Sequence, residues 1–129
     1  MPEPPRPSDF ELAILRVLWR EGRATVRQVH EALQAERELG YTTVLKTMQI
    51  MAEKKLVLRD ESAKSHVYRA AQAEHRTQGN LVKDLLDRAF GGSALKLMTH
   101  ALHARRPSPE ELDAIQALLD ETRAKRGRS

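Results

Sequence analysis

The side chains best suited to ligand chemistry gather in one stretch of the chain, residues 41–52. Its apolar residues recur at i, i+4, i+7 and i+8, the spacing of one buried helix face: Val44, Met48, Met51 and Ala52. The opposite side carries Thr43, Lys46, Thr47 and Ile50. Hydroxyls and an ammonium group near a helix N-terminus suit contacts with phosphates and base edges, so the stretch predicts a DNA recognition helix. The alternative is an ordinary amphipathic helix.

We expect the DNA contacts to come from this helix and from a basic loop that follows it. The expected contact residues are Tyr41, Thr42, Thr43, Lys46, Thr47, Ile50, Lys64 and Ser65. Thr42 is also the expected N-cap of the helix. Tyr41 could either stack on a sugar–phosphate or staple the helix start to the core, and the sequence favours neither.

Residues for catalysis or for holding a metal ion form no familiar pattern. The chain contains no G-x-S-x-G or H-E-x-x-H motif, and Gly91-Gly92-Ser93 is too short for a phosphate-binding loop. His100 and His103 are three residues apart and could bind a metal, but exposed surface histidines are the commoner explanation. We therefore expect a protein that is not an enzyme and that has neither a cofactor nor a metal site.

Composition favours a cytoplasmic protein with a nucleic-acid partner. Cysteine is absent, which excludes disulfides and thiolate metal sites and fits a reducing compartment. No apolar run has membrane-spanning length and the N-terminus has no hydrophobic signal core, so no membrane insertion is expected. Residues 42–70 contain six Lys/Arg against three Asp/Glu, whereas residues 1–41 contain six against seven. Positive charge therefore gathers around the predicted recognition helix.

Helix-start signals divide the N-terminal half of the chain. Four of the six prolines fall in residues 1–7, which predicts a disordered arm. Ser8 and Glu11 have the spacing of a capping box, and a helix follows to about Glu21. Thr25 and Gln28 form a second box at the start of a short helix. With the helix at 41–52, this order predicts a helix-turn-helix.

Two β-prone runs follow the third helix. Residues 56–59 and 65–69 flank a polar loop at 60–64, which reads as a β-hairpin. A hairpin directly after a helix-turn-helix is the wing of a winged helix. The expected fold is thus mainly α with a small β-hairpin, with a winged-helix DNA-binding domain at residues 8–71.

The C-terminal part reads as three amphipathic helices, with caps at Ser93 and Ser108. We expect residues 72–122 to be a dimerisation domain, because three short helices alone would bury little apolar surface. The residues expected at the dimer interface are Leu85, Leu86, Leu95, Met98, Leu102, Leu112, Ile115, Leu118 and Leu119. The alternative is that these stripes pack back on the winged helix. Residues 123–129 read as a frayed basic tail.

Several motifs together resemble the penicillinase-repressor family, often called the BlaI/MecI family. They are the run at residues 10–19 that ends in Leu-Trp, the Thr-Val-Arg-Gln-Val at 25–29, the Gly-Tyr-Thr-Thr-Val at 40–44 and the Val-Tyr at 67–68. The resemblance runs from about Ser8 to Asp120. It implies an N-terminal winged helix, a C-terminal helical dimerisation domain, and repression of transcription at short inverted repeats built on TACA/TGTA.

The chain departs from the family pattern at two positions near the end of the recognition helix. Members usually have Gly where this chain has Lys55; Gly allows a left-handed turn there, and Lys costs on the order of 1 kcal/mol. Many members have Arg where this chain has Ile50, so an expected phosphate contact is missing.

The resemblance also suggests a membrane sensor peptidase as a partner. In members paired with one, induction is linked to cleavage of an Asn–Phe bond, and His100-Ala101 stands at that place here. We therefore expect a protease of different specificity or relief of repression without cleavage.

Three functions remain open from the sequence. The leading one is a homodimeric, sequence-specific transcriptional repressor. The second is a winged helix that serves as a protein-interaction module, and the third is a repressor that senses a small molecule directly. The sequence names neither the target genes, nor the operator, nor the inducer.

Overall fold

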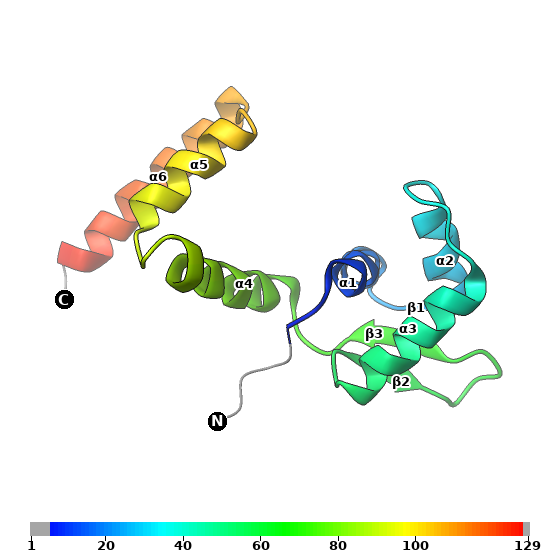
Figure 1. Ribbon diagram of the computed structural model, residues 1–129. Helices are drawn as coiled ribbons and strands as arrows, with labels where there is room; N and C mark the ends of the chain where they lie inside the picture. The colour runs from blue at the N-terminus through cyan, green and yellow to red at the C-terminus, as the bar shows by residue number, and fades with distance from the viewer. Residues whose placement is uncertain (1–5, 128–129) are drawn as a thin grey trace. The chain divides into compact units, whose positions relative to one another are not determined.

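The computed structural model describes residues 6–127 and confirms the predicted class, a mainly helical protein with a small sheet (Figure 1). The predicted arm at residues 1–7 lies mostly outside the described residues, as do residues 128–129. The chain forms two compact units, residues 1–82 and 83–129. The elements in chain order are α1 (Asp9–Glu21), β1 (Ala24–Thr25), α2 (Val26–Gln34), α3 (Tyr41–Glu53), β2 (Val57–Asp60), β3 (Val67–Ala70), α4 (Glu74–Ala89), α5 (Ala94–Ala104) and α6 (Pro109–Gly127).

Both predicted capping boxes are present. The Ser8 hydroxyl accepts from the Glu11 amide at 3.2 Å, and the Glu11 carboxylate accepts from the Ser8 amide at 2.8 Å. Thr25 and Gln28 make the same reciprocal pair at the start of α2. Gly22 stops α1 with a φ of 84°, a conformation that glycine adopts at low cost. Local side-chain chemistry therefore fixes where the first two helices begin and where α1 ends.

The wing contains one strand more than the sequence predicted. The sheet order is β1-β3-β2, and the two residues of β1 pair antiparallel with Val67 and Tyr68 of β3. The predicted hairpin is present, but β2 begins one residue later and β3 two residues later than expected. Ser65, expected in a strand, therefore lies in the loop. The extra strand ties the turn before α2 to the wing.

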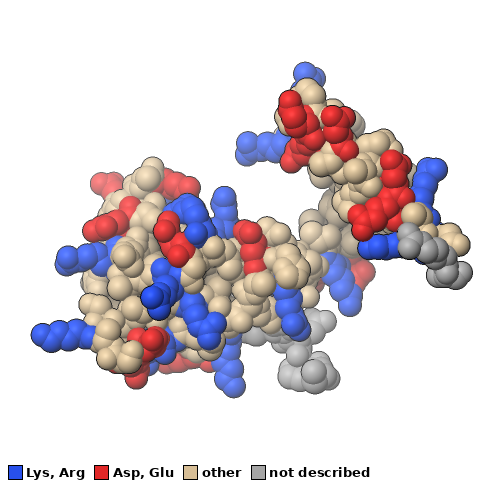
Figure 2. Space-filling model, turned by 180° about the vertical axis from the view of Figure 1, so that it is seen from behind, with Lys and Arg blue, Asp and Glu red and all other residues tan. Residues whose placement is uncertain are grey.

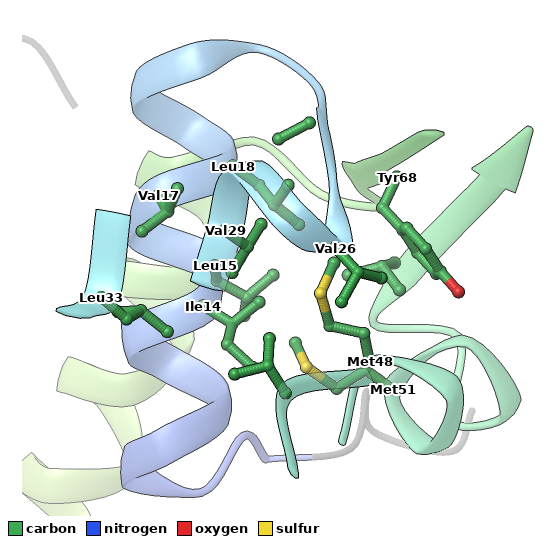
Figure 3. Packing of buried hydrophobic residues seen from close by; sticks show 13 residues of the cluster. Ile14, Leu15, Val17, Leu18, Val26, Val29, Leu33, Met48, Met51 and Tyr68 are labelled. Carbon is green, nitrogen blue, oxygen red and sulfur yellow. The ribbon is translucent and has the colours of Figure 1, made fainter. Parts of the chain in front are cut away.

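One apolar cluster joins the helices to the sheet (Figure 3). Ile14 and Leu18 of α1 meet Val29 of α2 and the thioether side chains of Met48 and Met51 of α3. Tyr68 closes the cluster on the sheet side, and its hydroxyl points away from the other side chains. Burial of this kind is the main stabilising term for a small domain.

A buried carboxylate links α1 to the end of α3. Glu11 is 4% exposed, and its Oε2 lies 3.0 Å from the Nζ of Lys54. Burial raises the pKa of Glu11, but the Ser8 amide and the Lys54 ammonium together outweigh this and hold the pKa below its ordinary value. Glu11 therefore serves both as part of a helix cap and as the anchor for the C-terminal end of α3.

The end of α3 is a left-handed turn built on Lys55. The Leu56 amide donates to the Met51 carbonyl at 2.9 Å and the Lys55 amide to the Ala52 carbonyl at 3.1 Å, the two bonds of a Schellman motif. Lys55 has a φ of 65°, the one positive φ of a non-glycine residue among those the structure describes. The departure from the family's glycine at this position is therefore a conformational cost.

The C-terminal unit buries little within a single chain. None of the described residues of α5 or α6 is buried. The one buried residue described in α4, Thr77, belongs to the N-terminal unit. Ser93 and Ser108 cap α5 and α6 as predicted, accepting from the Lys96 and Glu111 amides at 3.1 Å. α6 continues to Gly127, so residues 123–127 are helical, contrary to the predicted frayed tail.

We predict that Lys55→Gly stabilises the winged-helix unit by up to about 1 kcal/mol, because glycine adopts the left-handed conformation without steric cost. Urea unfolding followed by the fluorescence of Trp19, the single tryptophan, measures this. Lys55→Ala is the matched control, since it removes the ammonium group but keeps the Cβ. Equal stability of the glycine and alanine variants would contradict the strain at this position.

A second prediction concerns pH. Because the folded-state pKa of Glu11 is lowered, its stabilising contribution is complete above the ordinary value of 4.5 and is lost as the pH falls through the lowered pKa. Glu11→Gln should therefore cost stability at neutral pH, and its difference from the wild type should shrink below about pH 4.5. The exposed Glu31→Gln on α2 is the control, expected to cost little at any pH. The prediction would be wrong if the stability difference between Glu11→Gln and the wild type stayed constant from neutral to acidic pH.

Candidate nucleic-acid interface

The buried side of α3 determines which side faces outward. Val44, Met48 and Met51 are completely buried. An α-helix turns by about 100° per residue, so the residues most nearly opposite these three are Thr42, Lys46, Gln49 and Glu53. All four are exposed. This outer face of α3, defined by those four residues, is the part of the helix that a ligand meets first.

The predicted contact residues of α3 fall into four groups. Thr42 and Lys46 are on the outer face, while Thr43 and Ile50 are exposed on one flank of it. Thr47 is half-buried, and its hydroxyl donates to the Thr43 carbonyl at 2.8 Å, so this donor is already used within the helix. Tyr41, exposed on the other flank, is described below with its neighbours.

The prediction that Thr42 is the N-cap is wrong. Gly40 is the N-cap, with extended backbone angles, and no side chain caps the helix. Thr42 is the second helical residue. The helix therefore begins two residues earlier than predicted, and its first amides have no side-chain acceptor. Free amides at the positive end of a helix dipole attract anions, which suits an approach to phosphate.

The packing of Tyr41 favours the stapling role, whereas its stacking on a sugar–phosphate stays a prediction. Its ring meets that of His30 edge-on, with the centroids 5.9 Å apart. His30 Nε2 lies 2.6 Å from the Leu39 carbonyl oxygen, which also accepts from the Gln34 side-chain amide at 2.9 Å. One edge of Tyr41 thus secures the turn before α3, while 45% of the residue remains exposed.

A groove of about 510 Å³ runs between α3 and the wing. It is lined by Thr25, Val26, Arg27, Tyr41, Leu45, Gln49, Lys64, Ser65, His66 and Tyr68. Three predicted contact residues, Tyr41, Lys64 and Ser65, lie together here. Arg27 and Lys64 give the groove positive charge from two separate elements, the first turn of α2 and the wing loop. A negatively charged strand in this groove would meet both cations.

Sequence reasoning missed two residues of this groove. Arg27 lies in the first turn of a helix whose start was predicted correctly, so the capping box could have pointed to it as an exposed cation. Gln49 follows Leu45 by one helical turn, and its neutral side-chain amide is a weaker sequence signal for a DNA contact than a hydroxyl or a charge. Both are exposed.

A second groove, of about 380 Å³, flanks α3 on the side of β2. It is lined by Gln49, Ala52, Glu53 and Arg59. The Arg59 guanidinium lies 2.7 Å from the Glu61 carboxylate, and hydrogen bonding to the Tyr68 hydroxyl together with this carboxylate raises the pKa of Arg59. Arg59 is thus held in place beside α3, with Gln49 between the two grooves.

Figure 2 shows the winged-helix unit from behind the view of Figure 1, with Lys and Arg side chains interspersed with carboxylates. No field of one sign covers the face that this view presents. On the side of α3, the uncapped start of the helix and the basic groove beside the wing distinguish the candidate site.

Other kinds of site have little support in the described part of the chain. A cavity of about 290 Å³ between α1 and α2 is lined by Arg16, Val17, Trp19, Arg20, Ala32, Leu33, Glu36 and Glu74. Its volume lies at the lower limit of ligand pockets and four of its eight lining residues are charged, so it does not favour direct sensing of a small molecule. Residues 6–127 contain no group of three His, Cys, Asp or Glu residues that could hold a metal ion, and no helix among them is long and apolar enough to cross a membrane.

Comparisons with known proteins agree with this geometry. A family model described as penicillinase repressor matches residues 7–121. The Transcriptional regulator BlaI of Mycobacterium tuberculosis, from strains CDC 1551 / Oshkosh and ATCC 25618 / H37Rv, is 37% identical over 124 residues. The match covers 95% of this chain and 88% of that protein.

If DNA lies along this interface, Arg27→Ala and Lys46→Ala should each weaken binding to specific and random duplex alike. Each lost phosphate contact should lower the slope of log affinity against log salt by about 0.9. Fluorescence anisotropy over a salt series measures both effects. Arg20→Ala on α1, an exposed arginine beside Glu21, is the control and should leave the slope unchanged. Unaltered slopes in both test variants would remove these cations from the interface.

Proposed function

The chain belongs to the penicillinase repressor family, and from this premise we propose that it represses transcription as a homodimer bound to a short inverted-repeat operator. The family is one of transcriptional regulators and not an enzyme family. The observation that carries the proposal is the outer face of α3, which stands exposed beside a groove that holds two cations.

The DNA-binding part of the proposal follows from shape and chemistry. A recognition helix enters the major groove with its N-terminal residues toward base edges, and a wing contacts the adjacent backbone. In this chain Thr42, Thr43 and Lys46 supply hydroxyls and an ammonium in the first two turns of α3. Arg27 and Lys64 can hold the phosphates of the strand that passes the wing. The half-site sequence, TACA/TGTA-like, is proposed from the family resemblance.

The dimer part follows from the C-terminal unit. Leu95 is 76% exposed and Leu118 61%, and the nine predicted interface residues all remain exposed or half-buried in a single chain. An apolar surface of this kind on helices that bury almost nothing calls for a partner. A second copy of the chain is the simplest one, because a two-fold dimer uses the same surface twice.

Two-fold symmetry also connects the two units functionally. A symmetric dimer presents two α3 helices related by a two-fold axis, which matches an inverted repeat. Binding of the first half-site raises the effective concentration of the second α3 at its own half-site. Dimerisation through the C-terminal helices would therefore raise operator affinity without adding any base contact.

A protein-interaction module is the competing function. Nuclease footprinting of purified protein on the promoter of its own operon separates the two. The repressor proposal expects protection over two half-sites related by a dyad. Absence of any protected sequence there and in a selection from randomised duplexes would leave the interaction module as the better explanation.

For the dimer, we predict that Leu118→Ala shifts the protein toward monomer, because truncating a buried leucine costs about 2–5 kcal/mol. Sedimentation over a concentration series measures the shift, and binding to a two-half-site operator should weaken while binding to a single half-site stays the same. Asp113→Ala, on the opposite side of α6, is the control. A wild-type protein that is monomeric throughout the micromolar range would refute this part of the proposal.

A further inference from the structure

We infer that Gln49 is a specificity-determining residue that reads one adenine of the half-site through its side-chain amide. The inference rests on the proposed function, because it takes α3 to lie in the major groove. None of the DNA contacts proposed above uses this residue. Three observations support it: the direction of the side chain, its position between two grooves, and its chemistry.

The direction is fixed by the core. Met48 and Met51, which bracket Gln49 in the sequence, are completely buried. At about 100° per residue, Gln49 then falls on the same outer face as Thr42 and Lys46. The residue is exposed, and no described residue makes a hydrogen bond to its side-chain amide. Thr47 differs, because its hydroxyl is already bonded to the Thr43 carbonyl.

The position is the ridge between the two grooves of the interface. Gln49 lines the groove toward the wing with Tyr41 and Leu45, and it lines the groove toward β2 with Glu53 and Arg59. The two cations of the groove toward the wing, Arg27 and Lys64, come from other elements and not from the ridge. The groove toward β2 carries the carboxylate of Glu53, and its Arg59 is paired with Glu61. A phosphate strand is therefore expected along the groove toward the wing, and base edges at the ridge.

The chemistry selects the base. A glutamine amide offers a donor and an acceptor side by side, which match N7 and N6 of adenine in the major groove. The amide is neutral, so it adds little to the attraction that any duplex exerts on the protein. Gln49 should therefore influence which sequence is bound, whereas Lys46 one turn earlier influences how strongly any duplex is bound.

The test uses the full chain and a half-site obtained by selection from randomised duplexes, with each base pair then replaced in turn. Gln49→Ala should lose discrimination at a single adenine by about 5- to 150-fold, with affinity for random duplex and the salt slope unchanged. Gln49→Glu should move the preference at that same position to cytosine, because a carboxylate can accept a hydrogen bond from the N4 amino group of cytosine. Gln78→Ala, an exposed glutamine on α4, is the control and should keep the wild-type preferences.

Three results would overturn the inference. The first is a Gln49→Ala variant that keeps every wild-type preference. The second is a loss of discrimination at a base other than adenine. The third is an equal loss of affinity for all duplexes with a smaller salt slope, which would make Gln49 part of a phosphate contact. A wild-type protein that selects no sequence at all would instead overturn the proposed function, and the inference with it.

Discussion

The complete burial of Val44, Met48 and Met51 is the constraint on which the candidate interface depends. Each of these side chains contributes on the order of 1.5–3 kcal/mol by leaving water, so α3 cannot rotate about its axis without losing several of these contributions. The same burial that stabilises the domain therefore fixes which residues of α3 face outward. The core and the proposed recognition surface thus lie on opposite sides of one helix.

Both ends of α3 are tied to other elements. At the start, the ring contact between Tyr41 and His30 and the bonds to the Leu39 carbonyl hold the preceding turn. At the end, Lys54 pairs with the buried Glu11 of α1, and the left-handed Lys55 directs the chain into β2. The core thus prevents rotation of α3 about its axis, and the contacts at its two ends prevent it from sliding along that axis. A preorganised helix loses little conformational entropy on binding.

The sequence predicted those features that depend on neighbours a few residues apart. The capping boxes at Ser8 and Thr25 and the buried face of α3 are of this kind. The left-handed turn at Lys55 was expected only from the family resemblance. The sequence missed features that depend on distant pairing. β1 is a strand only because residues 24–25 meet residues 67–68, and Arg27 joins the wing loop only through the tertiary fold. The N-cap was misplaced because Gly40 gives a weaker signal than the hydroxyl of Thr42.

The scarcity of buried side chains in α5 and α6 has a consequence for the amount of protein in a cell. If these helices gain their core only when two chains meet, the stability of this unit depends on the concentration of the chain itself. A newly made or diluted chain would then be the form most open to degradation, while assembled chains would persist. A fall in the rate of synthesis would then lower the amount of the protein by a larger factor than the fall itself. A modest fall in synthesis would thus be enough to release the genes that the protein controls.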